Sequence, residues 1–558
     1  MREIDRRTTS EHQIPSLALM QAAAQACCEA ISQHFNGELA GKKAQILCGP
    51  GNNGGDGAAL AGLLSRAAVH IEVVLFETVE ATKGDARVNF EIAQALAREP
   101  DLSSFSFKEC KDEAAWSRVV GKVQSHDIIV DALFGTGLTR PLEGVFRQVA
   151  EHLNATRTAR DLNSARRPII VSVDIPSGLN ADASQLIGPT VTADLTVTFT
   201  APKAANVVAP ACFQNGKLVV ADIGSPASLL DEANVNLFVV ESNDARGWLR
   251  KTRYAPGSFK NSHGHVLVIA GSRGYVGAAV LCGEAAMRSG AGLVTIGTPA
   301  SAQSGVAASV MPEVMTTALA ETDRGAVSEE AVDHVTRLAA KATVIAIGPG
   351  LSAEDERTRR FVYSVVQQRR TPVVIDADAL NCLASYSGQG WPTELQGSDS
   401  APLILTPHPG EMLRLLGTTD KHALDDAPSV AREFAVKHKV ILVLKGGRSL
   451  VAAPDGQVFL NPTGNAGLGT AGAGDTLTGI IAGFVAQASA TSARTTGASE
   501  WPNESAAAVE STVAALYLGG LAGDLAARDL GMRTMVASDI REHLSEAVRS
   551  LDPEGEQP

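Results

Sequence analysis

Apolar and polar residues follow the same order twice along this chain. In each half, a short apolar run leads into a glycine-rich turn, and an alanine-rich stretch with apolar residues at helical spacing follows. Short apolar runs that alternate with helical patterns are typical of parallel strands whose two faces are covered by helices. The pattern therefore predicts two α/β domains.

The first half predicts a doubly wound sheet of the Rossmann type. A glycine-rich turn is expected at 49–57, and a helix is expected to follow it at 58–68. Strands are predicted at 44–48, 70–76, 127–132, 169–174 and 195–200.

The second half repeats the pattern after a stretch at about 225–255 that lacks clear periodicity. That stretch is the best candidate for a boundary, and we expect one domain at 1–225 and the other at 246–548. Two polar inserts, 154–167 and 489–506, are expected to be surface loops. Strands are predicted at 265–270, 343–347, 373–376, 403–406 and 440–444.

Composition narrows the class of protein. A chain of 558 residues is too long for a single core, and its 45% apolar and 20% charged residues suit compact domains. The net charge of −13 argues against a nucleic-acid or anionic-membrane surface. The seven cysteines are scattered without metal-binding spacing, and the long uncharged runs are broken by Gly, Ser and Pro. We expect a cytoplasmic protein with reduced thiols.

The segment 461–480 has the most informative chemistry. Its glycines lead up to Asp475, and Leu477, Ile480, Ile481 and Phe484 follow at helical spacing, which argues against a flexible linker. Such a loop presents backbone N–H groups to an anion at the positive end of a helix. Asp475 beside that anion is suited to take a proton from a hydroxyl that attacks phosphorus.

Three polar clusters in the first half fall where predicted strands end. The segment Gly-Pro-Gly-Asn-Asn-Gly-Gly-Asp-Gly at 49–57 departs from the GxGxxG spacing of dehydrogenases, and Asp131 and Asp174 end two later strands. Open α/β sheets bind ligands in the crevice at these strand ends. The alternative is that both aspartates are turn residues that cap the next helix.

The first half resembles the N-terminal epimerase domain, of the YjeF type, of the bifunctional NAD(P)H-hydrate repair enzymes. The matching segments are PGNNGGDG at 50–57, DALFGTGLTRPL at 131–142 and VDIPSGLN at 173–180. The resemblance implies that Asp174 is the acid/base residue and that potassium is held by Asn53, Asp131 and Ser177. It also implies contacts with the hydrated dinucleotide from Asn52, Asn53, Gly54, Gly55, Asp56, Gly135, Thr136, Gly137, Leu138, Thr139, Arg140, Pro141 and Asp174.

The second half resembles the dehydratase domain of the same enzymes, which has a ribokinase-like fold. Besides the Asp475 loop, the resemblance rests on HGHVLVIAGS (263–272), IGPGL (347–351), DADALN (376–381), TPHPGEM (406–412) and LKGG (444–447). It implies a hydrated-nicotinamide site formed by Ala278, Gly350, His408 and Asp475. It implies an anion hole of Gly472, Ala473 and Gly474, and a nucleotide site of Lys445, Gly446, Gly447, Arg448, Ser449 and Gly474. Asp376 and Asp378 fit either magnesium–phosphate electrostatics or a turn role.

The implied chemistry is a dehydration driven by a nucleotide. Asp475 would deprotonate the hydroxyl on the carbon beside the ring nitrogen, and that hydroxyl would accept a phosphoryl group. The ring nitrogen would then expel phosphate and restore NADH or NADPH. The resemblance implies ADP as co-substrate, leaving AMP, with Mg²⁺ for this step and K⁺ for the epimerase. It also implies a homo-oligomer.

Two functional domains on one chain suggest a division of labour. A dehydratase that attacks in line should accept only one isomer of the hydrate. The resemblance implies that this is the S isomer, so an epimerase would make the R isomer usable. One alternative is a ribokinase-like kinase for a vitamin precursor with a nucleotide-sensing N-terminal domain. The other is a partner-binding protein that keeps the first cleft as a ligand sensor.

Overall fold

The computed structural model describes residues 1–558 except 101, 121–125, 164–167, 389, 495–500 and 553–558. The chain divides into two compact units, Met1–Asn234 and Val235–Pro558. Each unit holds one α/β sheet, so the two α/β domains expected from the sequence are confirmed.

All seven strands of the N-terminal sheet run parallel, in the order β3-β2-β1-β4-β5-β6-β7. The strands are β1 (Lys43–Cys48), β2 (His70–Leu75), β3 (Phe105–Glu109), β4 (Ile128–Ala132), β5 (Ile169–Val173), β6 (Leu195–Phe199) and β7 (Lys217–Ala221). The helices are α1 (Arg2–Ser10), α2 (Ser16–His34), α3 (Asn52–Arg66), α4 (Gly84–Leu96), α5 (Glu113–Val120), α6 (Gly144–Leu162), α7 (Ala204–Val207) and α8 (Ala227–Asp231).

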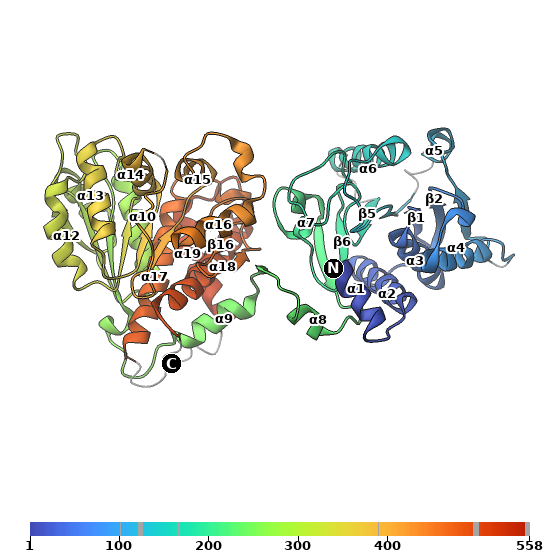
Figure 1. Ribbon diagram of the computed structural model, residues 1–558, viewed down its shortest axis with the longest axis horizontal. Coiled ribbons are helices and arrows are strands. Elements are labelled where there is room, and N and C mark those ends of the chain that lie inside the picture. Colours follow the sequence, from blue (N-terminus) through green and yellow to red (C-terminus); the bar gives the residue numbers. More distant parts are fainter. Residues whose placement is uncertain (101, 121–125, 164–167, 389, 495–500, 553–558) are drawn as a thin grey trace. The chain divides into compact units, whose positions relative to one another are not determined.

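Alternate residues of β1, β2, β4 and β5 enter two different cores. Ile46 packs with α2, α3 and α4 on one face, whereas Leu47 packs with α5 and α6 on the other. Figure 1 shows the sheet between these two layers of helices. Strand order reverses between β1 and β4, and this switch point is where a doubly wound sheet opens a ligand crevice.

The C-terminal unit has a mixed sheet of ten strands in the order β11-β10-β9-β12-β13-β14-β15-β16-β17-β8, with an antiparallel β15-β16-β17 meander. Its strands are β8 (Leu237–Val239), β9 (His265–Ile269), β10 (Leu293–Pro299), β11 (Met315–Leu319), β12 (Val344–Ile347), β13 (Val373–Ile375), β14 (Leu403–Leu405), β15 (Ile441–Leu444), β16 (Leu450–Ala452) and β17 (Val458–Leu460). Its helices are α9 (Ser242–Lys251), α10 (Val276–Arg288), α11 (Ala300–Ser309), α12 (Val332–Ala339), α13 (Glu356–Gln367), α14 (Ala377–Ser387), α15 (Pro409–Leu415), α16 (Ala427–His438), α17 (Ala473–Arg494), α18 (Glu504–Leu530) and α19 (Ala537–Leu551).

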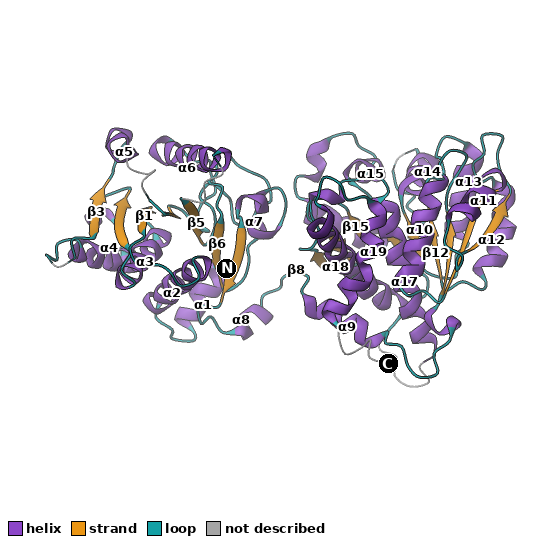
Figure 2. Ribbon diagram, turned by 180° about the vertical axis from the view of Figure 1, so that it is seen from behind, coloured by secondary structure: helices purple, strands orange, loops and turns teal. Residues whose placement is uncertain are grey.

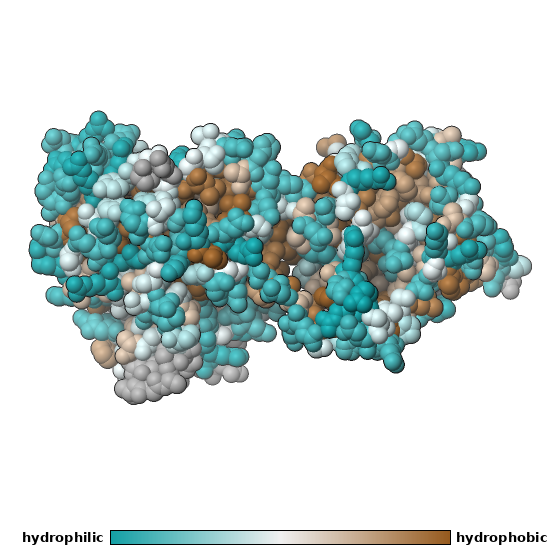
Figure 3. All heavy atoms as spheres, in the orientation of Figure 1, coloured by the Kyte–Doolittle hydropathy of each residue, from teal (hydrophilic) through white to brown (hydrophobic). Residues whose placement is uncertain are grey.

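The largest core of this unit joins α9, α10, α17, α18 and α19 to one face of the sheet. Figure 2 shows helices around its strands. Helix α18 is long and apolar enough to cross a membrane, but 72% of its most apolar window is buried inside the fold. Polar side chains cover much of the face of each unit that Figure 3 shows. We therefore interpret α18 as a core helix.

Several expectations about individual elements are wrong. The predicted turn at 49–57 ends early, because α3 already begins at Asn52. The glycines there serve close packing: a Cβ on Gly55 would lie 2.7 Å from the backbone of Ala86, and one on Gly57 would lie 2.6 Å from Ala132. The pattern of glycines thus resembles a turn although it belongs to a tightly packed helix.

The expected surface loops are also largely helical. Helix α6 continues through 154–162, because Leu153 and Thr156 are buried on its inner face. Helix α17 covers 489–494 and α18 starts again at Glu504, whereas 164–167 and 495–500 lie outside the described residues. The stretch at 225–255 contains α8, β8 and α9, whose short lengths hide their periodicity.

Candidate active sites

The N-terminal unit has a cavity of about 630 Å³ at the carboxyl ends of its strands. Two loops meet at the switch point, where the N–H of Gly49 donates to the carbonyl of Ala132 over 3.0 Å. A Cβ on Gly49 would lie 1.9 Å from the carbonyl oxygen of Leu133, so only glycine permits this approach. The loop after β1 and the loop after β4 are thereby held together around the cavity.

Seven of the predicted dinucleotide-binding residues line this cavity: Asn52, Asn53, Asp56, Gly135, Thr136, Gly137 and Asp174. Gly54 and Gly55 are instead buried within the packing of α3, and Leu138 belongs to the core under α5 and α6. Thr139, Arg140 and Pro141 are exposed and are not among the lining residues.

Asp174 is held tightly at the end of β5. Its backbone has a φ of 64°, which is uncommon for a residue other than glycine, and its side chain is buried. Lys203 donates from Nζ to Asp174 Oδ1 at 2.6 Å and also to Thr198 and the carbonyl of Phe199. The other oxygen, Oδ2, lies beside Gly135, where a Cβ would come within 3.3 Å. Asp174 therefore presents one oxygen towards the 131–137 loop and anchors the other.

Lys203 was missed by sequence reasoning. It lies four residues beyond the end of β6 in the segment Thr-Ala-Pro-Lys at 200–203, so its position after a predicted strand was the available signal. It is 7% exposed, and a buried ammonium needs a carboxylate partner. Arg2 and Asp5 of α1, which also line the cavity, had no signal in the sequence.

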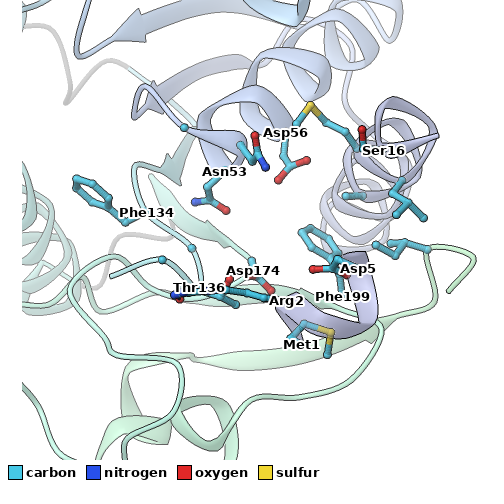
Figure 4. A pocket seen from close by; sticks show the side chains of 18 of the residues that line it. Met1, Arg2, Asp5, Ser16, Asn53, Asp56, Phe134, Thr136, Asp174 and Phe199 are labelled. Atoms are coloured by element: carbon cyan, nitrogen blue, oxygen red, sulfur yellow. The ribbon is translucent and has the colours of Figure 1, made fainter. Parts of the chain in front are cut away.

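Three carboxyl groups face this cavity, as Figure 4 shows: Asp5 from α1, Asp56 from α3 and Asp174 from the end of β5. Burial raises the pKa of Asp56 well above its usual range, and the charges of Asp174 and Asp5 raise it further. Burial likewise raises the pKa of Asp5. The cavity therefore combines an ion-paired carboxylate with carboxyl groups that favour the protonated form.

Asp131 lies at the end of β4 below the cavity. Its carboxylate accepts hydrogen bonds from Ser172 Oγ at 2.9 Å, from Ser177 Oγ at 2.6 Å and from the Ser177 N–H at 2.9 Å. Burial raises its pKa despite these bonds. Part of its role is thus to organise the loop after β5, and it does not cap the next helix in the way that the alternative reading expected.

The predicted potassium ligands suit a hard cation by their chemistry. Asn53, Asp131 and Ser177 offer amide, carboxylate and hydroxyl oxygens. Asn53 Nδ2 is buried without a hydrogen-bond partner in the described part of the chain. If the amide is turned, its oxygen takes this unpartnered position, where a cation could satisfy it. The residues present therefore fit a monovalent cation.

The switch point of the C-terminal sheet lies between β9 and β12. The N–H of Gly271 donates to the carbonyl of Pro349 at 2.8 Å, and Ser272 Oγ donates to the carbonyl of Gly350 at 2.8 Å. A Cβ on Gly350 would lie 3.0 Å from that of Ala278 on α10. The structure thus brings together Ala278 and Gly350, two of the four residues predicted for the hydrated-nicotinamide site.

The glycine-rich loop is fixed before α17 begins. Asn465 and the N–H of Gly464 both bond to the Asp524 carboxylate of α18, each at 2.9 Å. Gly472 then takes a φ of 85°, which glycine accepts without strain, and the chain enters α17 at Ala473. The first N–H groups of a helix lack acceptors within it, so Gly474 and Asp475 can offer theirs to an anion, whereas the N–H of Ala473 donates to the carbonyl of Thr470 at 3.4 Å.

Beside this helix start lies a lysine–aspartate pair. Lys445, which follows β15, donates from Nζ to Asp376 Oδ1 at 2.7 Å, and Thr478 of α17 donates to Asp376 Oδ2 at 2.7 Å. A Cβ on Gly474 would lie 3.4 Å from Lys445 Nζ. The predicted nucleotide charge and the predicted anion hole are therefore neighbours.

Asp475 makes no hydrogen bond or ion pair with any described residue. Burial raises its pKa to about 7, the negative charge of Asp376 adds to the rise, and Lys445 opposes it. A carboxyl group with a pKa near neutrality and no fixed partner can both accept and release a proton. This is the electrostatic setting that a general base requires.

His408 has a structural role. It is the N-cap of α15, and its Nδ1 accepts from the N–H of Gly410 at 3.0 Å, while Glu411 Oε2 accepts from the N–H of His408 at 2.8 Å. Its side chain is 52% exposed. Burial raises the pKa of Glu411, near Lys445 and Asp376. A ligand role for His408 stays a prediction, and Glu411 was not singled out from the sequence.

The described residues hold no group of three or more His, Cys, Asp and Glu side chains that could bind a metal. Asp376 is engaged with Lys445 and Thr478, and Asp378 accepts from the N–H of Ser352. Mg²⁺ is usually held by one or two carboxylates together with substrate phosphates. The residues present therefore do not form a resident magnesium site.

Family comparisons cover both units. A family model described as NAD(P)H-hydrate dehydratase matches residues 266–546, and a model of the YjeF-related protein N-terminus matches residues 16–205.

Relatives match over almost the full chain. The bifunctional NAD(P)H-hydrate repair enzyme Nnr of Moorella thermoacetica is 40% identical over 556 residues, which is 100% of this chain and 97% of that protein. The enzyme of the same name from Salinibacter ruber is 32% identical, and the match covers 100% of this chain and 96% of that protein. The one from Escherichia coli is 32% identical, and the match covers 91% of this chain and 85% of that protein.

Among solved structures, an ADP/ATP-dependent NAD(P)H-hydrate dehydratase from Bacillus subtilis, co-crystallized with ATP/Mg²⁺, is 29% identical. It covers 57% of this chain and 99% of its own, with a TM-score of 0.45. A ribokinase-like superfamily protein from Enterococcus faecalis is 26% identical. It covers 57% of this chain and 96% of its own, also with a TM-score of 0.45.

Proposed function

Because the chain belongs to the family of bifunctional NAD(P)H-hydrate repair enzymes, we propose that its two units repair hydrated NADH and NADPH in sequence. The N-terminal unit interconverts the R and S hydrates, and the C-terminal unit dehydrates the S hydrate at the expense of a nucleotide. The observation that carries the proposal is Asp475, an unpaired carboxyl group at the start of α17 beside the Lys445–Asp376 pair.

In the C-terminal site, Asp475 takes the proton of the substrate hydroxyl as that oxygen attacks the terminal phosphorus of the nucleotide. The N–H groups at the start of α17 and the Lys445 ammonium stabilise the charge on the transferred group. The lone pair of the ring nitrogen then expels phosphate, and the dihydropyridine ring is restored. Phosphorylation is needed because hydroxide is a poor leaving group.

We propose ADP as the phosphoryl donor, leaving AMP. Magnesium arrives with the nucleotide, and no protein ligand is assigned to it. The comparison of kcat/KM for ADP and ATP tests this choice. A preference for ATP would contradict the proposal that ADP is the donor and would leave the proposed dehydratase function unaffected.

In the N-terminal cavity, Asp174 acts as acid/base on the damaged ring, with Lys203 paired to one of its oxygens. A potassium ion held by Asn53, Asp131 and Ser177 would neutralise the buried Asp131 charge and fix the loops on either side of the cavity. Replacing K⁺ by a bulky organic cation should lower the epimerisation rate several-fold. An unchanged rate would remove potassium from the account.

One assay tests the whole proposal. Purified protein is given the mixed hydrates, Mg²⁺, K⁺ and ADP, and recovery of the dihydronicotinamide absorbance is followed. The wild type should recover both isomers, Asp174→Ala only the S isomer beyond slow spontaneous interconversion, and Asp475→Ala neither. A stable phosphorylated product of a vitamin precursor would instead support the kinase alternative. Cytoplasmic location and a homo-oligomer stay predictions.

A further inference from the structure

We infer that Asp56 is a second catalytic residue of the epimerase cavity, and that it and Asp174 exchange protons with the two faces of the hydrated ring. The inference rests on the proposed epimerase function and deepens it. It assigns the chemistry of interconversion, which is loss of the hydroxyl as water from one face and addition of water to the other.

The first support is the position of the two carboxyl groups. Asp56 reaches the cavity from the first two turns of α3, and Asp174 reaches it from the end of β5. Figure 4 shows the two side chains on different elements that border the cavity. A ring bound between α3 and the end of β5 could meet a carboxyl group from each element, and inversion at a single carbon requires one group on either face.

The second support is that the two groups have different partners. Lys203 pairs with Asp174, and Arg2, the other cationic side chain of the cavity wall, donates to the carbonyl of Thr136. Asp56 has neither an ion pair nor a hydrogen bond with any described residue. Burial and the nearby Asp174 and Asp5 charges raise its pKa. Asp56 is thus suited to give a proton while Asp174 is suited to accept one.

The groups around Asp56 come from each element that packs against it. Asp5 of α1 and Asp174 of the β5 end carry acidic charge, and Cys27 of α2 and Cys48 of β1 are buried thiols. Burial and the Asp56 charge raise the pKa of both thiols, so neither competes as a proton donor near neutrality. Asp5 is a third carboxyl group of the cavity with a raised pKa, and we assign the proton transfers to Asp56 and Asp174.

The reaction balances as follows. Asp56 gives its proton to the hydroxyl oxygen, the C–O bond breaks with its electron pair on oxygen, and water leaves. The ring-nitrogen lone pair forms a C=N bond to the same carbon. A water molecule on the other face then adds its oxygen to that carbon, the C=N pair returns to nitrogen, and the proton goes to Asp174. The reverse turnover, or exchange with solvent, returns the proton to Asp56.

An oxygen-exchange experiment tests the chemistry without any variant. The intact wild-type chain is incubated with the R hydrate in H₂¹⁸O without nucleotide, and the S hydrate is analysed by mass spectrometry. We expect one ¹⁸O in each newly formed S molecule, above the exchange in a protein-free control. Interconversion that keeps the original oxygen would overturn the proposal, because it would point to ring opening instead.

A variant then tests Asp56 itself. Asp56→Asn keeps the size of the side chain and cannot release a carboxyl proton, so kcat for interconversion should fall about 10²–10⁴-fold with little change in KM. Asp182→Asn, an exposed aspartate of the same unit, is the matched control and should keep the wild-type rate. A thermal unfolding curve like that of the wild type shows that the variant is folded.

Other outcomes are equally informative. A raised KM with an unchanged kcat would make Asp56 a binding residue, for example for a ribose diol, and would overturn its catalytic role. If the wild type fails to interconvert the hydrates at all, the proposed epimerase function falls. If the wild type interconverts them and Asp56→Asn does so equally fast, only this inference falls.

Discussion

The two candidate sites share a plan and differ in which carboxyl group the lysine holds. Each lies where parallel strands end, and each has one lysine–aspartate pair. Each also has carboxyl groups with a raised pKa that pair with no described residue, which are Asp56 and Asp5 in the first site and Asp475 in the second. In the N-terminal cavity the pair contains Asp174, the residue expected to do acid/base chemistry. In the C-terminal site the pair contains Asp376, and the expected base, Asp475, is unpaired.

The difference matches the two reactions. Under the proposal, epimerisation needs a proton donor and a proton acceptor, which an unpaired and a paired carboxyl group of the cavity supply. Phosphoryl transfer needs one base together with fixed positive charge for the phosphates, so the lysine is held beside the anion-binding helix start by a buried aspartate. A lysine–aspartate pair therefore has a different use in each unit.

The largest effect is expected from Asp475→Asn. Loss of the base should lower nucleotide-dependent dehydration of the S hydrate about 10²–10⁴-fold and leave interconversion of the isomers unchanged. Asp323→Asn, an exposed aspartate of the same unit, is the matched control and should behave as the wild type. Absorbance recovery and chromatography of the isomers measure the two activities on one preparation. Equal loss of both would mean that the units do not work separately.

Lys445→Met should affect both stability and nucleotide use. It leaves the Asp376 carboxylate, 1% exposed, without its cation, which should lower the free energy of unfolding by roughly 3–5 kcal/mol. Denaturant melts should show the loss. The double variant Lys445→Met with Asp376→Asn should regain much of the stability, because the unpaired buried charge is gone, but little activity. Recovery of both would show that Lys445 acts only through Asp376.

The rate of dehydration should depend on pH through Asp475. The base form of Asp475 is required and its pKa is raised to about 7, so dehydration should fall about tenfold for each pH unit below 7. The contribution of Asp475 to the free energy of unfolding should change in the opposite direction and rise as the pH falls. The folded state keeps this proton between pH 3.8 and 7 while the unfolded state loses it, so this group's contribution falls as pH rises through that window. Asp475→Asn should remove that slope, and a dehydration rate that is flat from pH 5 to pH 8 would contradict the assignment.

Sequence reasoning recovered the frame of both sheets well. The run predicted at 44–48 is β1, Lys43–Cys48, and the run predicted at 265–270 is β9, His265–Ile269, because continuous apolar runs mark strands buried on both faces. The prediction failed at glycines, which can serve either in a turn or in the close packing of a helix. Gly55 and Gly57 suggested a turn, but they allow α3 to pack closely.

Some site residues could be predicted from the sequence and others could not, because only some of them lie next to a recognisable local pattern. Asp131 lies near the end of a strand, Asp174 directly follows one, and Asp475 follows a glycine-rich loop, so the local sequence indicates them. Lys203 and Asp5 reach the first cavity only through the fold, since Lys203 is 29 residues from Asp174 along the chain. Local spacing in the sequence could not predict which carboxyl group each lysine would pair with.

A smaller effect should mark the point where the N-terminal loops meet. Gly135→Ala would place a Cβ 3.1 Å from Asn53 Oδ1 and 3.3 Å from Asp174 Oδ2, so both must shift. We expect a several-fold loss of epimerisation with dehydration of the S hydrate unchanged. Gly62→Ala on α3 meets only Leu96 at 3.8 Å and should leave both activities at the wild-type level. Equal rates for the two variants would mean that this contact does not position Asp174.

The most direct measurement supplies the R hydrate alone, with ADP, Mg²⁺ and K⁺, and follows both absorbance and the isomers. The wild type should restore the reduced nucleotide completely. Asp475→Asn should stop at a mixture of R and S hydrates, and Asp56→Asn should leave nearly all the R hydrate in place apart from slow spontaneous interconversion. Recovery of absorbance by Asp475→Asn at the wild-type rate would contradict the claim that the unpaired carboxyl group is the working base.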